Sequence, residues 1–201
     1  MDKEIIIEVG SHTGTDTEHL LKENSILYCF EPNHELYANL YNKYKYNNNV
    51  FVFPFAVDKQ SGFRQFNVQT VANKGCSSLN NFNQTIGDVW KDRTDFSFGD
   101  MYMVPTISLK DFINMYRLPR IDYLWIDAQG SDFDVIHGLG DKLHMVQNGK
   151  CEAALNVALY ENTDNHYLDI VRYLEGAGFL CEVYPDQSGI NAECDIYFTK
   201  N

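Results

Sequence analysis

The chain alternates short apolar runs, rich in β-branched and aromatic residues, with polar amphipathic segments. This alternation indicates β-α units around a mostly parallel sheet, because successive parallel strands need a crossover between them. The predicted strands span 4–9, 26–31, 50–55, 121–127, 153–159, 179–184 and 194–199. Their nearly continuous apolar character predicts a sheet that is buried on both faces.

Capping residues mark where the intervening helices begin and end. The predicted N-caps are Thr15, in a capping box with Glu18, then Asn33, and later Thr163 or Asp164. Gly176 and Gly178 are expected to end the last of these helices. Residues 185–193 leave no room for a crossover helix, so the last two strands should pair antiparallel.

Residues 61–104 interrupt the β-α pattern. The stretch GFRQFNVQ, at 62–69, reads as an extra strand, and a polar segment without a clear period follows it. A long irregular insertion in a compact domain is more often a functional loop than a packing device. We therefore expect one domain over residues 1–201, with a lid at about 61–104.

The charge of the chain restricts its partners. Its formal net charge of −12 argues against nucleic acid or an anionic membrane, which are bound mainly through clustered Lys and Arg. No apolar run approaches the roughly 20 residues of a membrane helix, and no signal peptide is readable. The five cysteines form no C-x-x-C pair and accompany no metal-type histidine cluster, which fits reduced thiols. These features predict a cytoplasmic protein without a metal site.

A turn with two glycines follows the first predicted strand, in Glu8-Val9-Gly10-Ser11-His12-Thr13-Gly14. Glycine lets a backbone turn sharply and approach a ligand, and the following helix start offers free N–H groups. A tight turn without a ligand is the alternative. The G-x-G-x-x-G spacing is absent, which disfavours a nucleotide-dependent oxidoreductase.

Two acidic residues end predicted strands at the edge where such sheets bind ligands. Glu31 stands about 20 residues after the glycine turn, where a carboxylate can accept hydrogen bonds from both ribose hydroxyls. Asp127 ends the fourth predicted strand, and Gly130 with Ser131 begins the next helix. The Asp127 carboxylate can face a cationic group or a reacting hydroxyl.

Seven segments together resemble the FkbM family of S-adenosylmethionine-dependent methyltransferases, over about residues 5–184. They are EVGSHTG, FEPNHELYANL, FAVDKQSG, CSSL, VPTISLKDF, IDYLWIDAQGSDFDVIHGL and YLEGAGF. The resemblance implies an α/β, three-layer Rossmann-like class I methyltransferase fold, with strand order 3-2-1-4-5-7-6 and strand 7 antiparallel. It also implies O-methylation of a hydroxyl on a sugar, polyketide or other small metabolite. The cofactor would be S-adenosylmethionine and the product S-adenosylhomocysteine.

The resemblance also implies roles for individual residues. Those expected at the methionine part of the cofactor are Glu8, Gly10, Ser11 and Gly14, with His12 in the same turn. Those expected at the ribose and adenine are Glu31, Pro32, Asn33, Ala56, Val57 and Asp58. Asp127 would face the methionine moiety or the acceptor, with Gln129 beside it.

Methyl transfer to an unactivated hydroxyl requires alignment of the acceptor and either a base or a bound cation. Asp127 is the first candidate for the base, followed by His137, Glu161 and His12. His137 has an alternative reading as a surface or packed side chain, and His12 as a residue that only caps the turn.

Three positions depart from the resemblance. Gln129 and Asn156 are amides where the family usually has acids, and an amide cannot act as a base. Trp125, where lysine is common, affects packing more than chemistry. The alternative to an active enzyme is therefore a cofactor-binding, catalytically silent module that partners another enzyme. The first predicted strand begins at residue 4, so acceptor coverage is expected from 61–104 or from another subunit of a homo-oligomer.

Overall fold

Seven strands form the main sheet of the computed structural model, which describes residues 2–71, 74–91, 93–186 and 192–201. They are β1 (Glu4–Val9), β2 (Ser25–Phe30), β3 (Val50–Phe53), β7 (Ile121–Ile126), β8 (Val146–Ala154), β9 (Phe179–Pro185) and β10 (Glu193–Lys200). Their order is β3-β2-β1-β7-β8-β10-β9, and β10 runs antiparallel to both of its neighbours. Numbered among themselves, these strands follow the predicted order 3-2-1-4-5-7-6. The predicted fold class is confirmed.

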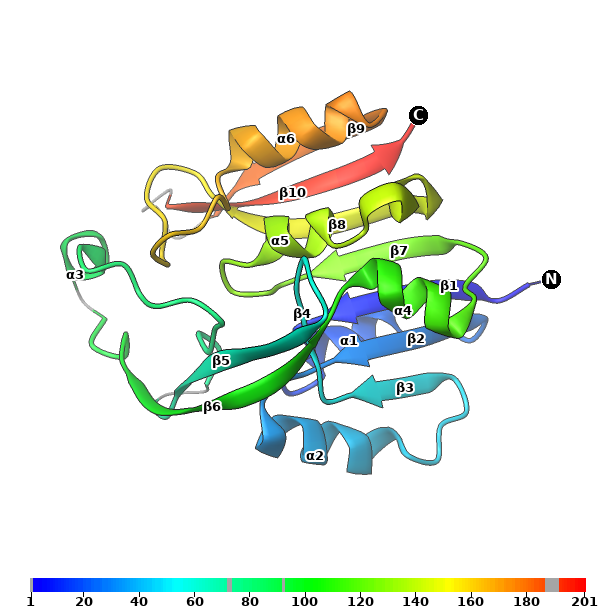
Figure 1. Cartoon of the computed structure of the whole chain (residues 1–201), viewed down its shortest axis with the longest axis horizontal. Coiled ribbons are helices and arrows are strands. Elements are labelled where there is room, and N and C mark those ends of the chain that lie inside the picture. Colours follow the sequence, from blue (N-terminus) through cyan, green and yellow to red (C-terminus); the bar gives the residue numbers. More distant parts are fainter. Residues whose placement is uncertain (1, 72–73, 92, 187–191) are drawn as a thin grey trace.

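Helices lie on both sides of this sheet (Figure 1). The helices α1 (Thr15–Leu20) and α2 (His34–Tyr44) flank one face, where Leu40 packs with Ile6 and Leu27. The opposite face is covered by α4 (Leu109–Tyr116), α5 (Asp132–His137), the 3-10 helix η1 (Gly140–Met145) and α6 (Tyr167–Gly176). The larger core, which includes Phe112 and Ile136, lies on that side.

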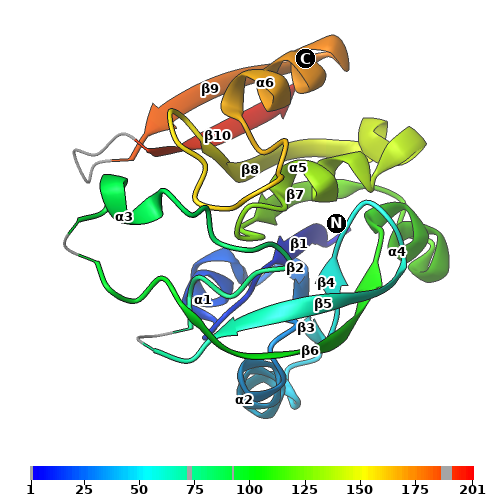
Figure 2. The same ribbon diagram turned by 60° about the vertical axis from the view of Figure 1, so that its left-hand side comes forward.

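A second sheet lies beside the carboxyl ends of β1 and β2 (Figures 1 and 2). It contains β4 (Ala56–Val57), β5 (Gly62–Gln69) and β6 (Phe98–Ile107), with the short helix α3 (Ile86–Val89) between β5 and β6. The predicted strand at 62–69 is confirmed, but the prediction of irregular structure is wrong from residue 98 onward. Met101 and Met103 are exposed while Val104 is buried, so β6 lacks the continuous apolar run that marks a fully buried strand. Residues 72–73 and 92 of the predicted lid lie outside the described residues.

Two of the predicted helix caps are wrong. Helix α1 begins after Gly14, which has φ 83° and makes no side-chain cap, so Thr15 belongs to the helix itself. Helix α6 begins after His166, whose side chain accepts from the Leu168 N–H, rather than at residue 163 or 164. Asn33 does cap α2, by accepting from two backbone N–H groups.

The predicted strand at 153–159 is wrong in its bounds, because β8 runs from 146 to 154. In this strand buried Cys151 and Ala153 alternate with Lys150 and Glu152, which are only partly buried. A search for continuous apolar residues does not detect such a strand, because every second residue is polar. The same alternation shows that burial on both faces holds for β1 and β2 but not for β7, β8, β9 and β10.

Two further observations concern the cysteines and the helices. All five cysteines are free thiols. None of the helices in the described parts of the chain has the length and apolar character needed to cross a membrane.

Gly149 on β8 tests the packing of the sheet. A Cβ there would stand 2.2 Å from Cζ of Phe198 and 2.6 Å from the Leu124 carbonyl oxygen, so backbone must move to admit it. We expect Gly149→Ala to lower the free energy of unfolding by about 1–3 kcal/mol in urea denaturation. Gly176→Ala is the control, because a Cβ there meets nothing within 4 Å, and stability should stay constant or rise slightly. Equal losses of unfolding free energy in both variants would contradict the close packing of Gly149 against Phe198 and Leu124.

Candidate functional site

A cavity of about 250 Å³ lies at the carboxyl ends of β1, β2 and β7. Three turns of the main sheet supply one wall, with Gly10, His12, Glu31, Pro32, Asp127 and Gln129. The second sheet and the segment after it supply the other, with Ala56, Val57, Phe66, Lys74, Ser77 and Leu79. The cavity is therefore built from segments far apart in the sequence.

Gly10 fixes the turn after β1 against β7. It has φ +82°, and a Cβ at this position would lie 1.9 Å from the Asp127 carbonyl oxygen. The N–H groups of Gly10 and Ser11 both donate to the Phe30 carbonyl at 3.0 Å. The turn at Gly10 therefore contacts the ends of both β2 and β7, in a backbone conformation that only glycine allows.

Glu31 forms a buried carboxylate in the wall of the cavity. Its Oε2 accepts from the backbone N–H of His12 and its Oε1 from that of Asn33, both at 2.7 Å. Burial raises the pKa of Glu31 to about 7, although the two backbone donors act in the opposite direction. Each carboxylate oxygen has further acceptor capacity, so the group can take hydrogen bonds from a pair of neighbouring hydroxyls.

Asp127 is held by a chain of side-chain contacts. Its Oδ1 accepts from Nε2 of Gln129 at 2.6 Å, and Oε1 of Gln129 accepts from the Tyr160 hydroxyl at 2.7 Å. The Ser78 hydroxyl donates to the Gln129 carbonyl at 2.6 Å. Burial raises the pKa of Asp127, while the hydrogen bond from Gln129 acts to lower it. Gln129, an amide at an expected acidic position, thus orients the acid beside it.

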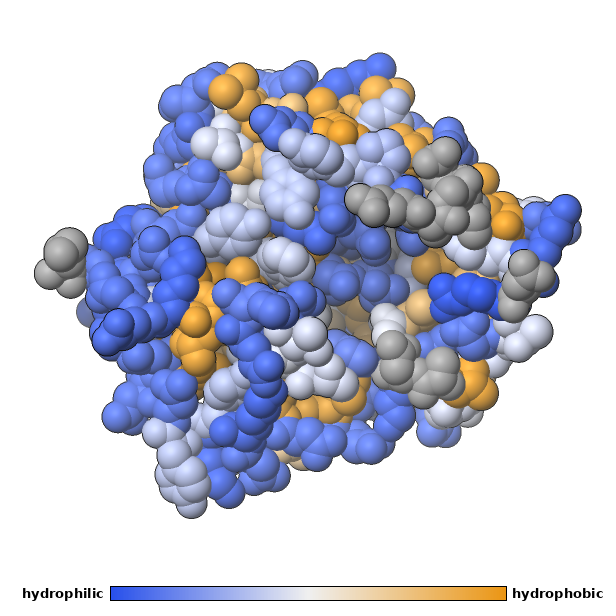
Figure 3. Space-filling view, turned by 180° about the vertical axis from the view of Figure 1, so that it is seen from behind, coloured by the Kyte–Doolittle hydropathy of each residue, from blue (hydrophilic) through white to orange (hydrophobic). Residues whose placement is uncertain are grey.

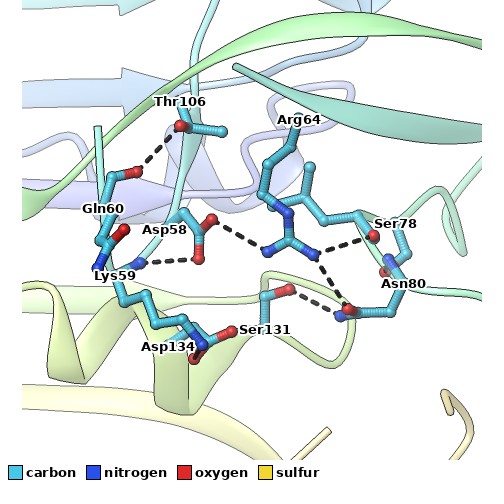
Figure 4. A network of polar contacts seen from close by, with 10 residues as sticks. Asp58, Lys59, Gln60, Arg64, Ser78, Asn80, Thr106, Ser131 and Asp134 are labelled. Atoms are coloured by element: carbon cyan, nitrogen blue, oxygen red, sulfur yellow. Dashed lines mark hydrogen bonds and ion pairs between the residues drawn. The ribbon is translucent and has the colours of Figure 1, made fainter. Parts of the chain in front are cut away.

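Asp58 belongs to a network that fastens the second sheet to the main one (Figure 4). It accepts from Nη1 of Arg64 at 3.0 Å, and Nη2 of Arg64 donates to the Leu79 carbonyl at 3.3 Å. Asn80 completes the link by donating to Oγ of Ser131 at 2.9 Å. Asp58 is nearly buried and is not part of the cavity lining, so it supports the wall.

Other residues predicted at the cofactor lie behind the cavity rather than in its lining. They are Glu8, Ser11, Gly14 and Asn33. The Glu8 carboxylate is fully buried and accepts from the Thr17 hydroxyl at 2.6 Å. Burial raises its pKa. Oε1 of Glu8 and Oγ of Ser11 make no hydrogen bond to the described residues, which leaves two buried polar atoms at the glycine turn without partners.

The remaining candidate bases are not brought to the cavity. His137 is exposed on α5, where its ring centre lies 4.2 Å from that of Phe133 and 4.6 Å from that of Tyr173, with both ring pairs tilted. Glu161 follows β8, and its backbone N–H donates to the Asn81 carbonyl. Asn156 is exposed in the loop after β8 and not on a strand. Asp127 and His12 are the two candidates that line the cavity.

Sequence reasoning did not identify Tyr160 or Lys74 as parts of the site. Ser77 and Ser78 could have been identified from the sequence, because they lie in the CSSL segment that carries the family resemblance. Tyr160 follows β8 in an irregular loop, and no periodicity marks it. Within the described residues, no group of three or more His, Cys, Asp or Glu side chains could hold a metal ion.

The chain belongs to the FkbM methyltransferase family. Residues 8–181 match the methyltransferase FkbM domain. Among curated proteins, none matches this sequence. The predicted family is confirmed. Methyltransferase-fold neighbours solved with SAH or S-adenosyl-L-methionine support the predicted cofactor.

Solved structures with low sequence identity share the fold. The methyltransferase FkbM from Methylobacillus flagellatus KT matches with a TM-score of 0.61 at 12% identity, over 98% of this chain and 44% of its own. The present chain thus spans less than half of that protein. A Streptococcus mutans protein assigned as a methyltransferase, solved with SAH, has a TM-score of 0.55 at 12% identity, over 100% and 91% of the two chains. An rRNA methylase from Streptococcus thermophilus has a TM-score of 0.53 at 10% identity, over 99% and 87%.

The raised pKa of Glu31 predicts that cofactor affinity depends on pH. With a pKa of about 7, the ionised fraction of this carboxyl rises roughly tenfold between pH 6 and pH 8. Since the ionised form is the better acceptor for ribose hydroxyls, the Kd for S-adenosylhomocysteine should fall by up to about tenfold over that range. Calorimetric titration at several pH values measures this. Glu31→Gln should remove the dependence, and an unchanged slope in that variant would assign it to another group.

Proposed function

We propose that this protein transfers a methyl group from S-adenosylmethionine to a hydroxyl of a sugar or a related small metabolite. The observation that carries the proposal is that one cavity holds Glu31, suited to a ribose, and Asp127, suited to a reacting hydroxyl. The two carboxylates end neighbouring parts of one sheet, and Gly10 lies between them. Membership of the FkbM methyltransferase family supports the same reaction.

The residues of the cavity fit this cofactor. Glu31 would hold the ribose hydroxyls, and the apolar side chains of Val57, Phe66 and Leu79 would contact the adenine. Gly10 and Asp127, which line the cavity at the glycine turn and at the end of β7, would lie at the polar methionine end. The cofactor supplies an electrophilic methyl group, and the remaining chemistry falls to the chain.

Asp127 would remove the proton of the acceptor hydroxyl. Gln129 holds one of its oxygens at 2.6 Å, and the other accepts no hydrogen bond from the described residues. Burial raises the pKa of Asp127, which makes the carboxylate a stronger base. The Gln129 contact also fixes the direction of the free oxygen, and Tyr160 fixes Gln129 in turn. The proton of the hydroxyl would then rest on Asp127.

The charge of the site favours a neutral or cationic acceptor, including a glycan. The net charge is −12, and Lys74, the one cationic side chain among the described lining residues, pairs with Glu35. A nucleic-acid backbone would meet little compensating charge here. The same reasoning keeps our expectation that neither nucleic acid nor a membrane is a partner. The free cysteines keep our expectation of a cytoplasmic protein. Residues 61–104, or a second subunit, would cover the acceptor.

The second candidate function is a cofactor-binding module without activity. The amides Gln129 and Asn156 motivate it, because neither can act as a base. Both hypotheses include cofactor binding, so only turnover separates them.

The first experiment is calorimetric titration with S-adenosylmethionine, S-adenosylhomocysteine and NAD. We expect saturable binding of the first two, no binding of NAD, and loss of binding in Glu31→Ala because the ribose contact is removed. Failure of the wild-type chain to bind either sulfur compound would contradict the proposal.

Turnover is then followed as S-adenosylhomocysteine formed with a panel of sugars and hydroxylated metabolites. Asp127→Asn should lower kcat by about 100-fold or more, since the base is lost, while the Kd for S-adenosylhomocysteine changes less than about threefold. Asp169→Asn, an exposed acid on α6 outside both the cavity and residues 61–104, is the matched control. Tight cofactor binding without turnover on any acceptor would favour the silent module.

A further inference from the structure

One face of the main sheet is open over β8, β10 and β9. In the part of the chain that the structure describes, α5 and α6 pack on the other face, against Cys151, Ile196 and Phe198, all 1% exposed or less. On the open face Tyr197 is 39% and Tyr184 is 53% exposed. Figure 3 views the molecule from behind, where hydrophilic and intermediate residues surround only scattered hydrophobic ones.

Strand register arranges the side chains of this face in two rows. The first row is Glu152 on β8, Asp195 on β10 and Tyr184 on β9, and the second is Lys150, Tyr197 and Glu182. We call these six residues the acidic face. A cavity of about 640 Å³, separate from the cofactor cavity, has five of the six in its lining, together with Asp186 and Pro185.

Lys150 shows how this face holds a cation. Its Nζ lies 2.9 Å from Oδ2 of Asp195 and 4.4 Å from the centre of the Trp125 ring. The Tyr197 ring centre is 5.9 Å away. Carboxylate and aromatic ring together form a favourable environment for a positive charge.

The acidic face carries more negative charge than Lys150 compensates. The partly buried Glu152 carboxylate makes no hydrogen bond or ion pair with the described residues. Its pKa is raised, first by burial and then by the charges of Asp127, Glu193, Asp132 and Asp195. Tyr184, whose hydroxyl donates to Glu182 at 2.6 Å, adds a second exposed aromatic ring. A further cation bound to the acidic face would relieve the repulsion between Glu152 and the neighbouring carboxylates.

We propose that the acidic face is a docking surface for an arginine-bearing segment of another polypeptide. Arginine fits because its planar guanidinium can pair with Glu152 or Glu182 while stacking on Tyr184 or Tyr197. A second copy of the chain is disfavoured, because the net charge of −12 makes like surfaces repel. This inference goes beyond the proposed reaction and does not require it, although Glu152 lies near enough to Asp127 for the two charges to interact.

The spacing of the acids defines the partner further. Glu152 and Glu182 lie two strands and one row apart, so their backbones are separated by roughly 12 Å. Two arginines about two turns apart on a helix match this distance.

The test measures binding of a fluorescein-labelled, alanine-based peptide with four arginines along one helix face, by fluorescence anisotropy. The same peptide with glutamine in place of arginine is the peptide control. Glu152→Gln/Glu182→Gln should weaken binding at least tenfold, and Tyr184→Ser about threefold. Glu23→Gln/Glu175→Gln removes equal charge from exposed positions outside the acidic face and should change the Kd less than twofold. Unchanged melting temperature and S-adenosylhomocysteine affinity would verify that each variant is folded.

Three results would overturn the proposal. Equal losses of peptide affinity in the two double variants would show that binding comes from general attraction by net charge. Absence of peptide binding, with spermidine bound in a manner that depends on Glu152, would make the face a small-amine site. Self-association that disappears in Glu152→Gln/Glu182→Gln, measured by sedimentation, would assign the face to a second copy.

Discussion

The contact between Gly10 and the Asp127 carbonyl governs the geometry of the site. A Cβ would come within 1.9 Å of that oxygen, so the turn after β1 and the end of β7 meet more closely than any other residue permits. The same turn donates two backbone hydrogen bonds to Phe30 at the end of β2. Glu31 and Asp127 face one cavity because these three strand ends converge on a single glycine.

The sequence predicts best what local chemistry decides. The glycine turn, the Asn33 cap and the acids at strand ends are all in place, because positive φ, capping and sheet edges depend on few residues. The hydrogen bond from Tyr160 to Gln129 joins positions 31 residues apart. Asp58 accepts a hydrogen bond from Arg64 and lies outside the cavity lining. Neither arrangement leaves a periodic signal, since both depend on how distant segments pack.

Errors in strand prediction have a common physical cause. β6 and β8 each bury one side of the strand and leave the other polar or exposed, so apolar continuity fails as their marker. In β8 this failure coincides with the acidic face, where Lys150 and Glu152 stand on the side without a helix. The residues that made the strand hard to recognise are therefore the ones available for contacts beyond the chain.

Gln129 shows how an amide can serve at a position where an acid is expected. A second carboxylate 2.6 Å from Asp127 would repel it, and one proton would have to be shared between the two groups. An amide donates instead, and its own oxygen is fixed by Tyr160. The arrangement leaves Asp127 as the single carboxylate in the chain of contacts. A substitution that looks like a loss in the sequence thus becomes, in the structure, a support for the acid beside it.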